Sequence, residues 1–431
     1  MNQYEQMYQD KRVTMDEALS FIRDGDVIGT SQCANEPTAI FEALPRLKGK
    51  VRCKFFAPMC FNQHAFFSDP EFLADFETDI TFLMGAARAA HDRGAIGYYP
   101  GDLHNGAGRW IETNGCTVFI TAATSMDRHG YLHIPLCLIH ERAFLEAADR
   151  VIVQVNPNLP VTYGDTELHI RDVTCLVEAA TPIPMLARSQ PGEVEMEIGR
   201  NVASLVRDGD TIQLGIGGIP NAVGSYLMDK HDLGVHSEML TNSMVDLVEA
   251  GVITGRKKTL HPGKLIGTFA YGDQRLYDMI DRNPAVRILR GEYVNDPWVV
   301  SRNDNFISIN SALQIDLTGQ ICSESIGSRQ YSGSGGQTDM AIGAAHARGG
   351  RNVIAVASTK KGGAISTIMP TLAPGSVVTL SRNEIDFVVT EYGIARLRGL
   401  SVRERVKNLI AVAHPDFRAE LKKEADRLLL V

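Results

Sequence analysis

The length, composition and charge of the sequence limit its function before any motif is considered. Its 431 residues exceed one ordinary domain core, so we expect two or three domains. The 44% hydrophobic and 22% charged fractions are typical of a soluble globular protein, and we find no apolar run typical of a signal peptide or membrane span. A formal net charge of -8 with scattered Lys and Arg argues against nucleic-acid binding. We therefore expect a cytoplasmic protein.

The first pattern along the chain is repeated in its second half. Ala18–Leu44 predicts a helix, an Arg-Asp-Gly-Asp turn, a strand, a loop and a second helix, and Ala203–Leu227 repeats this order. The two turns, Arg23–Asp26 and Arg207–Asp210, lie 184 positions apart. Two weaker sequence similarities follow in the same order. Ser125–Ile134 resembles Gln314–Ser323, and Asp149–Val155 resembles Arg351–Ala357. The sequence therefore indicates a duplicated domain.

Short Val- and Ile-rich runs alternate with helical patterns in both halves. This alternation predicts an α/β fold of two similar open, mostly parallel sheets flanked by helices. We place the domains at residues 1–187 and 188–431, joined near the polar stretch 187–195. Ligands of such sheets bind at the carboxyl ends of the strands. We expect the active site in the cleft between the two domains.

The cysteines and histidines do not predict a metal site. Seven cysteines form no CxxC pair, so reduced thiols are the simplest interpretation. His129 and His133 have a spacing that could bind a metal on a helix, but Gly130 indicates a turn that leads into a strand. We therefore expect no bound metal.

A glycine-rich stretch, QLGIGGIPNAV at Gln213–Val223, lies between a predicted strand and a predicted helix. Glycines there let backbone N–H groups approach an anionic or polar ligand. Gly215 and Gly217 fit a dinucleotide fingerprint, but Pro220 stands where that motif needs glycine or alanine. Proline is favourable in the first turn of a helix. The stretch thus predicts a helix that begins beside a ligand other than a nicotinamide cofactor, with a tight turn without ligand as the alternative.

Glu238 follows the next predicted strand, in GVHSEML, and so should lie at the same sheet edge. Three roles are open to it: a ribose contact, an ordinary residue at a helix start, or a carboxylate nucleophile. Carried through the repeat, Glu238 falls opposite Phe55. Only the second half would then contain a catalytic carboxylate.

Seven motifs in fixed order resemble one family. They are GIGGIPNAV, HSEM, KTLHPGK, EYVNDP, SGSGGQTDM, STKKGGAIS and VTEYGIARLRG, followed by AHPDFR. Together they resemble the acetyl-CoA hydrolase/transferase family, and within it the 4-hydroxybutyrate CoA-transferase group, over essentially the whole chain. The resemblance implies CoA transfer from an acyl-CoA to a carboxylate, by a ping-pong route through a glutamyl-CoA thioester. It also implies CoA as a substrate, no permanently bound cofactor, and a homodimer or larger homo-oligomer.

The same resemblance assigns roles to individual residues. Glu238 would be the nucleophile, with Asn295 and the backbone of Gly336 as hydrogen-bond donors to the oxyanion. Arg188 would hold the acceptor carboxylate. The CoA-binding residues would be Gly215, Gly217, Gly218, Ile219, Pro220, Gly335, Lys360 and Lys361. Without the family, Asn295 and Gly336 fit an Asx turn and a flexible loop, and the three cations fit a solvated surface.

The first-half counterpart of the glycine-rich loop is TSQCANEP, Thr30–Pro37. It has Cys33, Asn35 and Glu36 in place of glycine, which suits side-chain contacts to an acyl group.

Three functions are consistent with these residues. The favoured one is a CoA-transferase for short-chain acids such as acetate, butyrate and 4-hydroxybutyrate, or for a small dicarboxylate such as succinate or itaconate. The second is an acyl-CoA hydrolase, in which water replaces the acceptor. The third is a non-catalytic domain that senses acyl-CoA or another metabolite, and an intact Glu238 with both glycine loops argues against it. A dehydrogenase is a distant fourth.

Overall fold

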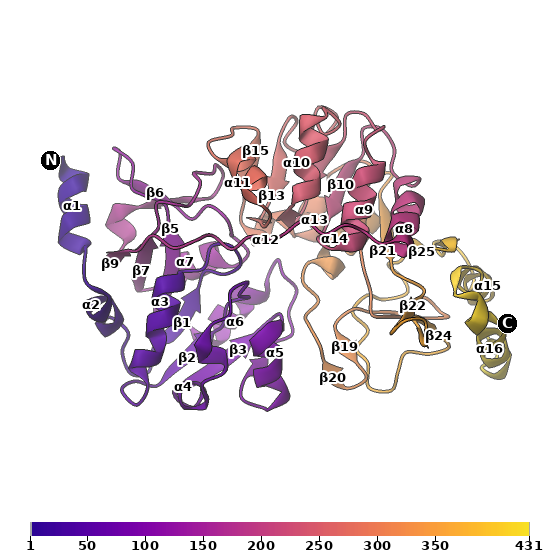
Figure 1. Ribbon diagram of the computed structural model, residues 1–431, viewed down its shortest axis with the longest axis horizontal. Coiled ribbons are helices and arrows are strands. Elements are labelled where there is room, and N and C mark those ends of the chain that lie inside the picture. The colour runs from indigo at the N-terminus through magenta and orange to yellow at the C-terminus, as the bar shows by residue number, and fades with distance from the viewer. Residues whose placement is uncertain (1, 431) are drawn as a thin grey trace. The chain divides into compact units, whose positions relative to one another are not determined.

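The computed structural model describes residues 2–430, which form two compact units (Figure 1). The first unit contains the chain up to Leu186 together with Ile266–Val294. The second contains Ala187–Leu265 and the chain from Asn295 onwards. Each unit is built on a mostly parallel sheet with helices on its faces, which confirms the α/β class predicted from the alternating pattern.

The sheet of the first unit has the strand order β4-β3-β2-β1-β5-β7-β9, and all neighbours are parallel. Its strands are β1 (Val27–Thr30), β2 (Cys53–Phe56), β3 (Phe76–Ile80), β4 (Gly97–Tyr98), β5 (Val118–Ala123), β7 (Arg150–Val155) and β9 (Cys175–Glu178). A small antiparallel pair joins β6 (Tyr131–His133) to β8 (Glu167–His169). The segment that carries His129 and His133 is thus a turn and a strand, as predicted.

Short helices cover this sheet and bury a core rich in phenylalanine. They are α1 (Gln3–Lys11), α2 (Met15–Ser20), α3 (Thr38–Ala43), α4 (Pro70–Asp75), α5 (Gly85–Asp92), α6 (Gly106–Asn114) and α7 (Glu141–Ala147), with 3-10 turns at Leu44–Leu47, Ala65–Phe67 and Ile170–Asp172. The segment that returns to this unit carries β13 (Leu265–Gly267), β14 (Phe269–Ala270), α11 (Gln274–Ile280), β15 (Val286–Ile288) and α12 (Gly291–Val294).

The strands of the second unit follow the order β11-β10-β16-β21-β25-β26. They are β10 (Thr211–Leu214), β11 (Gly234–His236), β16 (Phe306–Asn310), β21 (Arg351–Ala355), β25 (Phe387–Thr390) and the antiparallel edge strand β26 (Gly393–Arg396). Because β11, β10, β16, β21 and β25 are parallel, their carboxyl ends meet at one edge.

The helices of this unit are α8 (Glu193–Ala203), α9 (Gly218–Tyr226), α10 (Asn242–Glu249), α13 (Pro297–Val300), α14 (Gln337–His346), α15 (Val402–Val412) and α16 (Pro415–Arg427). Small strands lie in its connections: β12 (Met239–Leu240), β17 (Gln314–Asp316), β18 (Ile321–Cys322), β19 (Ser325–Ile326), β20 (Arg329–Gln330), β22 (Thr359–Lys360), β23 (Ile365–Ser366) and β24 (Ile368–Met369).

The two sheets share one strand register, which confirms the duplication. In each sheet, one residue from each of four adjacent strands is paired across the sheet. The paired residues are Phe55, Ile28, Val118 and Arg150 in the first unit, and Val235, Ile212, Ile307 and Arg351 in the second. Ile28 and Ile212 are 184 positions apart, the offset of the two Arg-Asp-Gly-Asp turns. The repeat found in the sequence is therefore a repeat of structure.

The register corrects one sequence alignment. The connection from Ile28 to Phe55 spans 27 positions, whereas that from Ile212 to Val235 spans 23, so the offset falls from 184 to 180. Glu238 is therefore the counterpart of Pro58 rather than of Phe55. Proline carries no carboxylate either, so the first unit still lacks an equivalent of Glu238.

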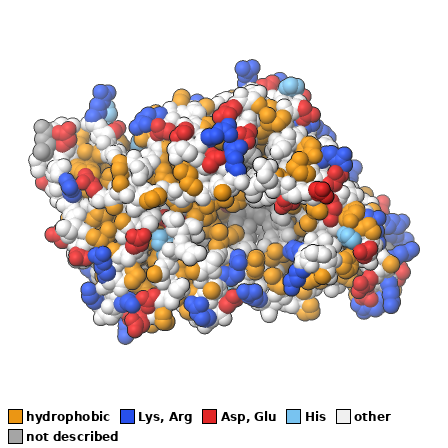
Figure 2. Space-filling model, viewed as in Figure 1, with side chains coloured by type: hydrophobic (Ala, Val, Ile, Leu, Met, Phe, Trp, Pro, Cys, Tyr) orange, Lys and Arg blue, Asp and Glu red, His pale blue; other side chains and the backbone are white. Residues whose placement is uncertain are grey.

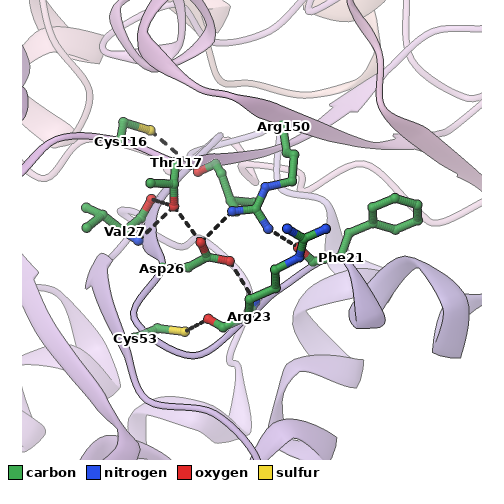
Figure 3. Close-up of polar contacts among 9 residues, drawn as sticks. Phe21, Arg23, Asp26, Val27, Cys53, Cys116, Thr117 and Arg150 are labelled. Atoms are coloured by element: carbon green, nitrogen blue, oxygen red, sulfur yellow. Dashed lines mark hydrogen bonds and ion pairs between the residues drawn. The ribbon is translucent and has the colours of Figure 1, made fainter.

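The Arg-Asp-Gly-Asp turn anchors each sheet through its last aspartate. In the first unit, Asp26 accepts hydrogen bonds from the backbone N–H of Arg23 at 2.7 Å and the hydroxyl of Thr117 at 2.8 Å, and it pairs with Arg150 at 2.5 Å (Figure 3). In the second unit, Asp210 accepts from the backbone N–H of Arg207 and pairs with Arg351. Each aspartate thus fixes the first residue of another strand of its sheet.

Charged side chains of both signs are interspersed on the face drawn in Figure 2, with a dense mixture over α15 and α16 at the right. In the part of the chain that the structure describes, no helix combines the length and the apolar character needed to cross a membrane.

We expect Arg150→Met to lower the free energy of unfolding by about 3 kcal/mol, because it leaves Asp26 buried without its cation. Urea denaturation, followed by fluorescence and circular dichroism, measures the change. Arg46→Met is the matched control: Arg46 also pairs with an aspartate, Asp16, but these side chains are 58% and 83% exposed, and such pairs contribute less than about 1 kcal/mol. Equal stability of the two variants would show that the buried pair does not anchor the sheet.

Candidate active site

The second unit brings the three predicted catalytic residues into contact. Glu238 follows β11, Asn295 precedes α13, and Gly336 is the residue before α14. The side-chain N–H of Asn295 donates to Oε2 of Glu238 at 3.3 Å. A Cβ at position 336 would lie 2.0 Å from that same oxygen and 2.1 Å from the Asn295 amide nitrogen. Only glycine permits this approach, so the loop closes directly on the carboxylate.

The environment of Glu238 destabilises its ionised form. Burial raises the pKa of Glu238 to about 7, while hydrogen bonds from the Asn295 side chain and the Gly336 backbone act in the opposite direction. The carboxylate of Asp339, buried in the first turn of α14, raises the pKa further. Asp339 stands in the motif SGSGGQTDM, yet sequence reasoning assigned it no role. A carboxyl group that is half ionised near neutral pH is typical of catalytic sites.

Hydrogen bonds hold both the strand β11 that precedes Glu238 and the residue that links the two. The hydroxyl of Ser237 donates to the backbone oxygen of Leu214 at 3.4 Å, which ties the end of β11 to the end of β10. The buried ammonium of Lys258 donates to the backbone oxygens of Val235 at 2.6 Å and Lys264 at 2.9 Å. Burial lowers the pKa of Lys258 to about 7. Sequence reasoning missed this clamp, although KTLHPGK contains Lys258.

The glycine-rich loop lies where the sequence predicted it, between the end of β10 and the start of α9. Gly217 has φ +118°, a conformation that favours glycine, and Pro220 lies in the first turn of the helix. The loop borders a pocket of about 350 Å³. The pocket is lined by Glu195, Gly215, Ile216, Gly217, Gly218, Ile219, Pro220, Ile309, Asn310, Ser311 and Ala355. Its residues from α8 and β16 were not predicted.

The other predicted CoA-binding residues lie outside this pocket. Gly335, with φ +53°, directly precedes Gly336 and so borders the Glu238 site. Lys360 and Lys361 lie on the hairpin of β22 and β23, where the half-buried Lys360 ammonium donates to the backbone oxygen of Leu313 at 2.7 Å. Burial lowers the pKa of Lys360. A contact of either lysine with CoA phosphates stays a prediction.

Arg188 already has a carboxylate partner. One of its guanidinium nitrogens lies 2.9 Å from Oδ2 and 3.3 Å from Oδ1 of Asp246, on α10. Both side chains are more than one third exposed. A substrate carboxylate would have to replace Asp246, and the role of Arg188 in substrate binding stays a prediction.

Two side chains of the first-unit loop, Thr30–Pro37, already have partners within the protein. The Asn35 amide donates to the backbone of Ala122, and its oxygen accepts from the backbone N–H of Leu136. Glu36 accepts from the backbone N–H groups of Phe61 and Asn62 and lies 2.7 Å from His64. Both side chains are buried and hold neighbouring loops, and a contact of this loop with an acyl group stays a prediction.

Among the described residues of the first unit, Glu36, Cys60 and His64 place donor atoms within 4.8 Å of one another. These residue types can bind a metal, but the backbone contacts of Glu36 and its pairing with His64 account for the arrangement without an ion. His129 and His133 belong to no such group in the described chain.

A duplicated α/β fold with a buried glutamate between an asparagine amide and a glycine loop fits a CoA-transferase-type enzyme. The N-terminal domain model of the acetyl-CoA hydrolase/transferase family matches residues 1–187, and its C-terminal domain model matches residues 272–425. The chain belongs to the acetyl-CoA hydrolase/transferase family, as its motifs predicted.

Similar proteins of known name cover the full chain. The 4-hydroxybutyrate coenzyme A transferase of Clostridium kluyveri is 40% identical over 98% of this chain and 99% of its own. The succinyl-CoA:cyclohexane-1-carboxylate CoA transferase of Geobacter metallireducens is 38% identical over 99% and 97%. These relatives confirm the predicted enzyme class.

Solved structures agree with this assignment. RipA from Yersinia pestis superposes with a TM-score of 0.94 at 34% identity and covers 100% of both chains. The 4-hydroxybutyrate CoA-transferase of Porphyromonas gingivalis superposes with a TM-score of 0.84 at 32% identity and covers 99% of this chain and 100% of its own.

Replacing Glu238 by glutamine should stabilise the protein above neutral pH. Because burial raises the pKa of Glu238 from 4.5 to about 7, ionisation of this carboxylate destabilises the folded state increasingly as the pH rises through this interval. The stability of Glu238→Gln relative to the natural protein should grow from pH 4.5 to 7 and then stay constant, at no more than about 3 kcal/mol. Thermal unfolding at several pH values measures this.

The exposed Glu420→Gln on α16 is the control and should show no such pH-dependent gain. If the difference in stability between Glu238→Gln and the natural protein is the same at all pH values, Glu238 is not desolvated.

Proposed function

We propose that this protein transfers CoA from an acyl-CoA to a free short-chain carboxylate through a covalent thioester on Glu238. The observation that carries the proposal is the buried Glu238 carboxylate, bonded to the Asn295 amide and covered by the Gly336 backbone. In the proposed mechanism, this carboxylate is the nucleophile and the two groups beside it are the hydrogen-bond donors to the oxyanion.

The first half-reaction has two bond exchanges. The Glu238 carboxylate attacks the thioester carbonyl, and the tetrahedral intermediate expels the CoA thiolate to leave a mixed anhydride. The thiolate then attacks the glutamyl carbonyl and expels the acyl group as a free carboxylate, which leaves CoA bound to Glu238 as a thioester. The acceptor carboxylate reverses both exchanges, so the energy of the thioester bond is kept and no net proton is consumed.

The environment of Glu238 supports both roles of the residue. Desolvation makes its carboxylate less stable than in water, which favours attack, and the thioester that follows carries no charge to desolvate. The Asn295 amide and the Gly336 N–H are positioned to stabilise the oxyanions of the intermediates. Because attack requires the ionised form, the rate should rise as the pH rises through about 7.

Short-chain acids are the substrate class that the relatives support. Their names include the short-chain acids 4-hydroxybutyrate, butyrate and acetate, and one relative is named for a cyclic acid, cyclohexane-1-carboxylate. Relatives named acetyl-CoA hydrolase are more distant: the one from Kluyveromyces lactis is 33% identical over 50% of this chain and 40% of its own. We therefore favour transfer over hydrolysis, and turnover of acyl-CoA with and without an added carboxylate distinguishes the two.

The covalent step predicts a trapped intermediate. Incubation with acetyl-CoA and no acceptor should add CoA to Glu238 and release acetate, because the first half-reaction needs only the donor. Intact-mass measurement and peptide mapping detect the adduct, and borohydride should reduce it to an alcohol and inactivate the enzyme. Glu238→Gln, which keeps the shape but loses the nucleophile, should form no adduct. An adduct that maps to Glu292 or Glu324, or a fully active Glu238→Gln, would contradict the assignment.

Asn295→Ala should lower kcat more than it weakens binding of the CoA ester, because the amide acts chiefly when negative charge develops on the oxyanion. The loss of one such donor typically costs about 10²- to 10³-fold in rate. Steady-state kinetics with acetyl-CoA as the varied substrate measures both parameters. A higher KM with an unchanged kcat would assign Asn295 to ground-state binding instead.

A further inference from the structure

Lys258 is a buried cation whose partners are backbone oxygens rather than a carboxylate. The residue is 4% exposed, and in the part of the chain that the structure describes it forms no ion pair. Its ammonium donates to the backbone oxygens of Val235 at 2.6 Å and Lys264 at 2.9 Å. A buried ammonium without an anion destabilises a fold, and a methionine would fill the same space without that penalty. What the lysine adds is this pair of hydrogen bonds.

The backbone around Lys258 leaves room for its side chain along β11. A Cβ at Gly234, on this strand, would lie 2.3 Å from Cγ and 2.8 Å from Cδ of Lys258, so the stem occupies the place of the missing side chain. The loop that carries Lys258 is closed by Gly255, whose backbone oxygen accepts from the N–H of Lys258 at 3.2 Å and of Gly263 at 2.9 Å. Lys258 is therefore fixed on β11 by its stem as well as by its ammonium.

The strand that Lys258 holds leads directly to Glu238. Val235 lies in β11, three positions before Glu238. Lys258 ties Val235 to Lys264, whereas the hydroxyl of Ser237 makes a longer bond of 3.4 Å to the end of β10. The shorter bonds of Lys258 are thus the stronger restraint on this stretch.

The surroundings of Glu238 leave little room for a shift of β11. Oε2 of Glu238 accepts from the side-chain N–H of Asn295 at 3.3 Å, and a Cβ at Gly336 would lie 2.0 Å from the same oxygen. A misplacement of about 1 Å can lower a rate by about 10²-fold when reacting groups must meet in one geometry. The rate of any reaction at this carboxylate therefore depends on an accurate position of the end of β11.

We propose that Lys258 is a positioning residue of the transfer reaction, whose two backbone hydrogen bonds hold β11 so that the Glu238 carboxylate meets its hydrogen-bond donors. The proposal rests on the proposed function, in which Glu238 is the nucleophile. Lys258 acts through the backbone and not by its charge. It is not among the groups that shift the pKa of Glu238, which, besides burial, are Asn295, Asp339 and the Gly336 backbone.

Lys258→Met tests this role, because methionine fills the space but removes both hydrogen bonds. We expect kcat to fall by about 10- to 100-fold and the KM for acetyl-CoA to stay unchanged, since Lys258 acts only through Glu238. The CoA adduct at Glu238 should form more slowly by the same factor but reach the same final amount, which rapid mixing and intact-mass measurement follow. The midpoint of the pH–rate profile should stay at about 7, because Lys258 does not set the pKa of Glu238.

Lys257→Met is the matched control. Lys257 directly precedes Lys258 but is exposed, so its replacement should change neither kcat nor the rate of adduct formation. Full kcat in Lys258→Met would overturn the proposal. A higher KM with an unchanged kcat, or a shifted midpoint of the pH–rate profile, would also overturn it, since these results would assign Lys258 to substrate binding or to the electrostatics of the site.

Gly234→Ala tests the same contact where Lys258→Met does not fold. The added methyl group must displace the stem of Lys258, yet the ammonium and its donors remain. We expect a lower kcat with an unchanged KM in this variant, after thermal unfolding has shown that it is folded. Full kcat in a folded Gly234→Ala would contradict the proposal.

Failure of the proposed function would look different. The natural protein would then form no CoA adduct at Glu238, whereas the contact of Glu238 with Asn295 can still be measured without any chemistry. A double-mutant cycle of Glu238→Ala and Asn295→Ala on the free energy of unfolding gives the coupling of the two side chains. A coupling that is lost in the Lys258→Met background would support the positioning role whatever reaction the site performs, and an equal coupling in both backgrounds would overturn it.

Discussion

The buried pairing of an aspartate with an arginine sets the geometry on which the rest of each unit depends. Asp26 with Arg150, and Asp210 with Arg351, join the turn before one central strand to the first residue of another. Because these strands are parallel, their carboxyl ends all lie at the edge of the sheet opposite to the ion pair. The ion pair thus anchors the amino ends of the same strands whose carboxyl ends lead into the loops of the site.

The same framework carries the proposed catalytic residues in one copy and buried structural contacts in the other. In the second unit the strand after the turn is followed by glycines and the next strand by Glu238, with a short connection between them. In the first unit the loop after the corresponding strand contains Glu36, bound to neighbouring backbone, and the residue opposite Glu238 is Pro58. The duplicated scaffold thus provides equivalent edges, and under the proposed function only the second edge carries the nucleophilic carboxylate.

Much of the fold could be predicted from local patterns, because strand and helix runs, the repeat and the glycine loop are visible in the sequence. Glu238, Asn295 and Gly336 were recognised through motifs, and the structure brings them into contact. Asp339 and Lys258 lay within the same segments but were missed, since their roles arise from contacts between distant elements. The alignment of Glu238 with Phe55 was wrong because a connection of different length shifts the register, which only strand pairing reveals.

The pKa of about 7 at Glu238 links this site to the acidity of its surroundings. Free carboxylic acids, when they accumulate, release protons and lower the pH of a poorly buffered compartment. A fall of one pH unit from neutrality would leave about one tenth of the Glu238 side chains ionised. An enzyme that acts through this carboxylate would therefore slow as acid builds up and recover as it is cleared, without any separate regulatory site.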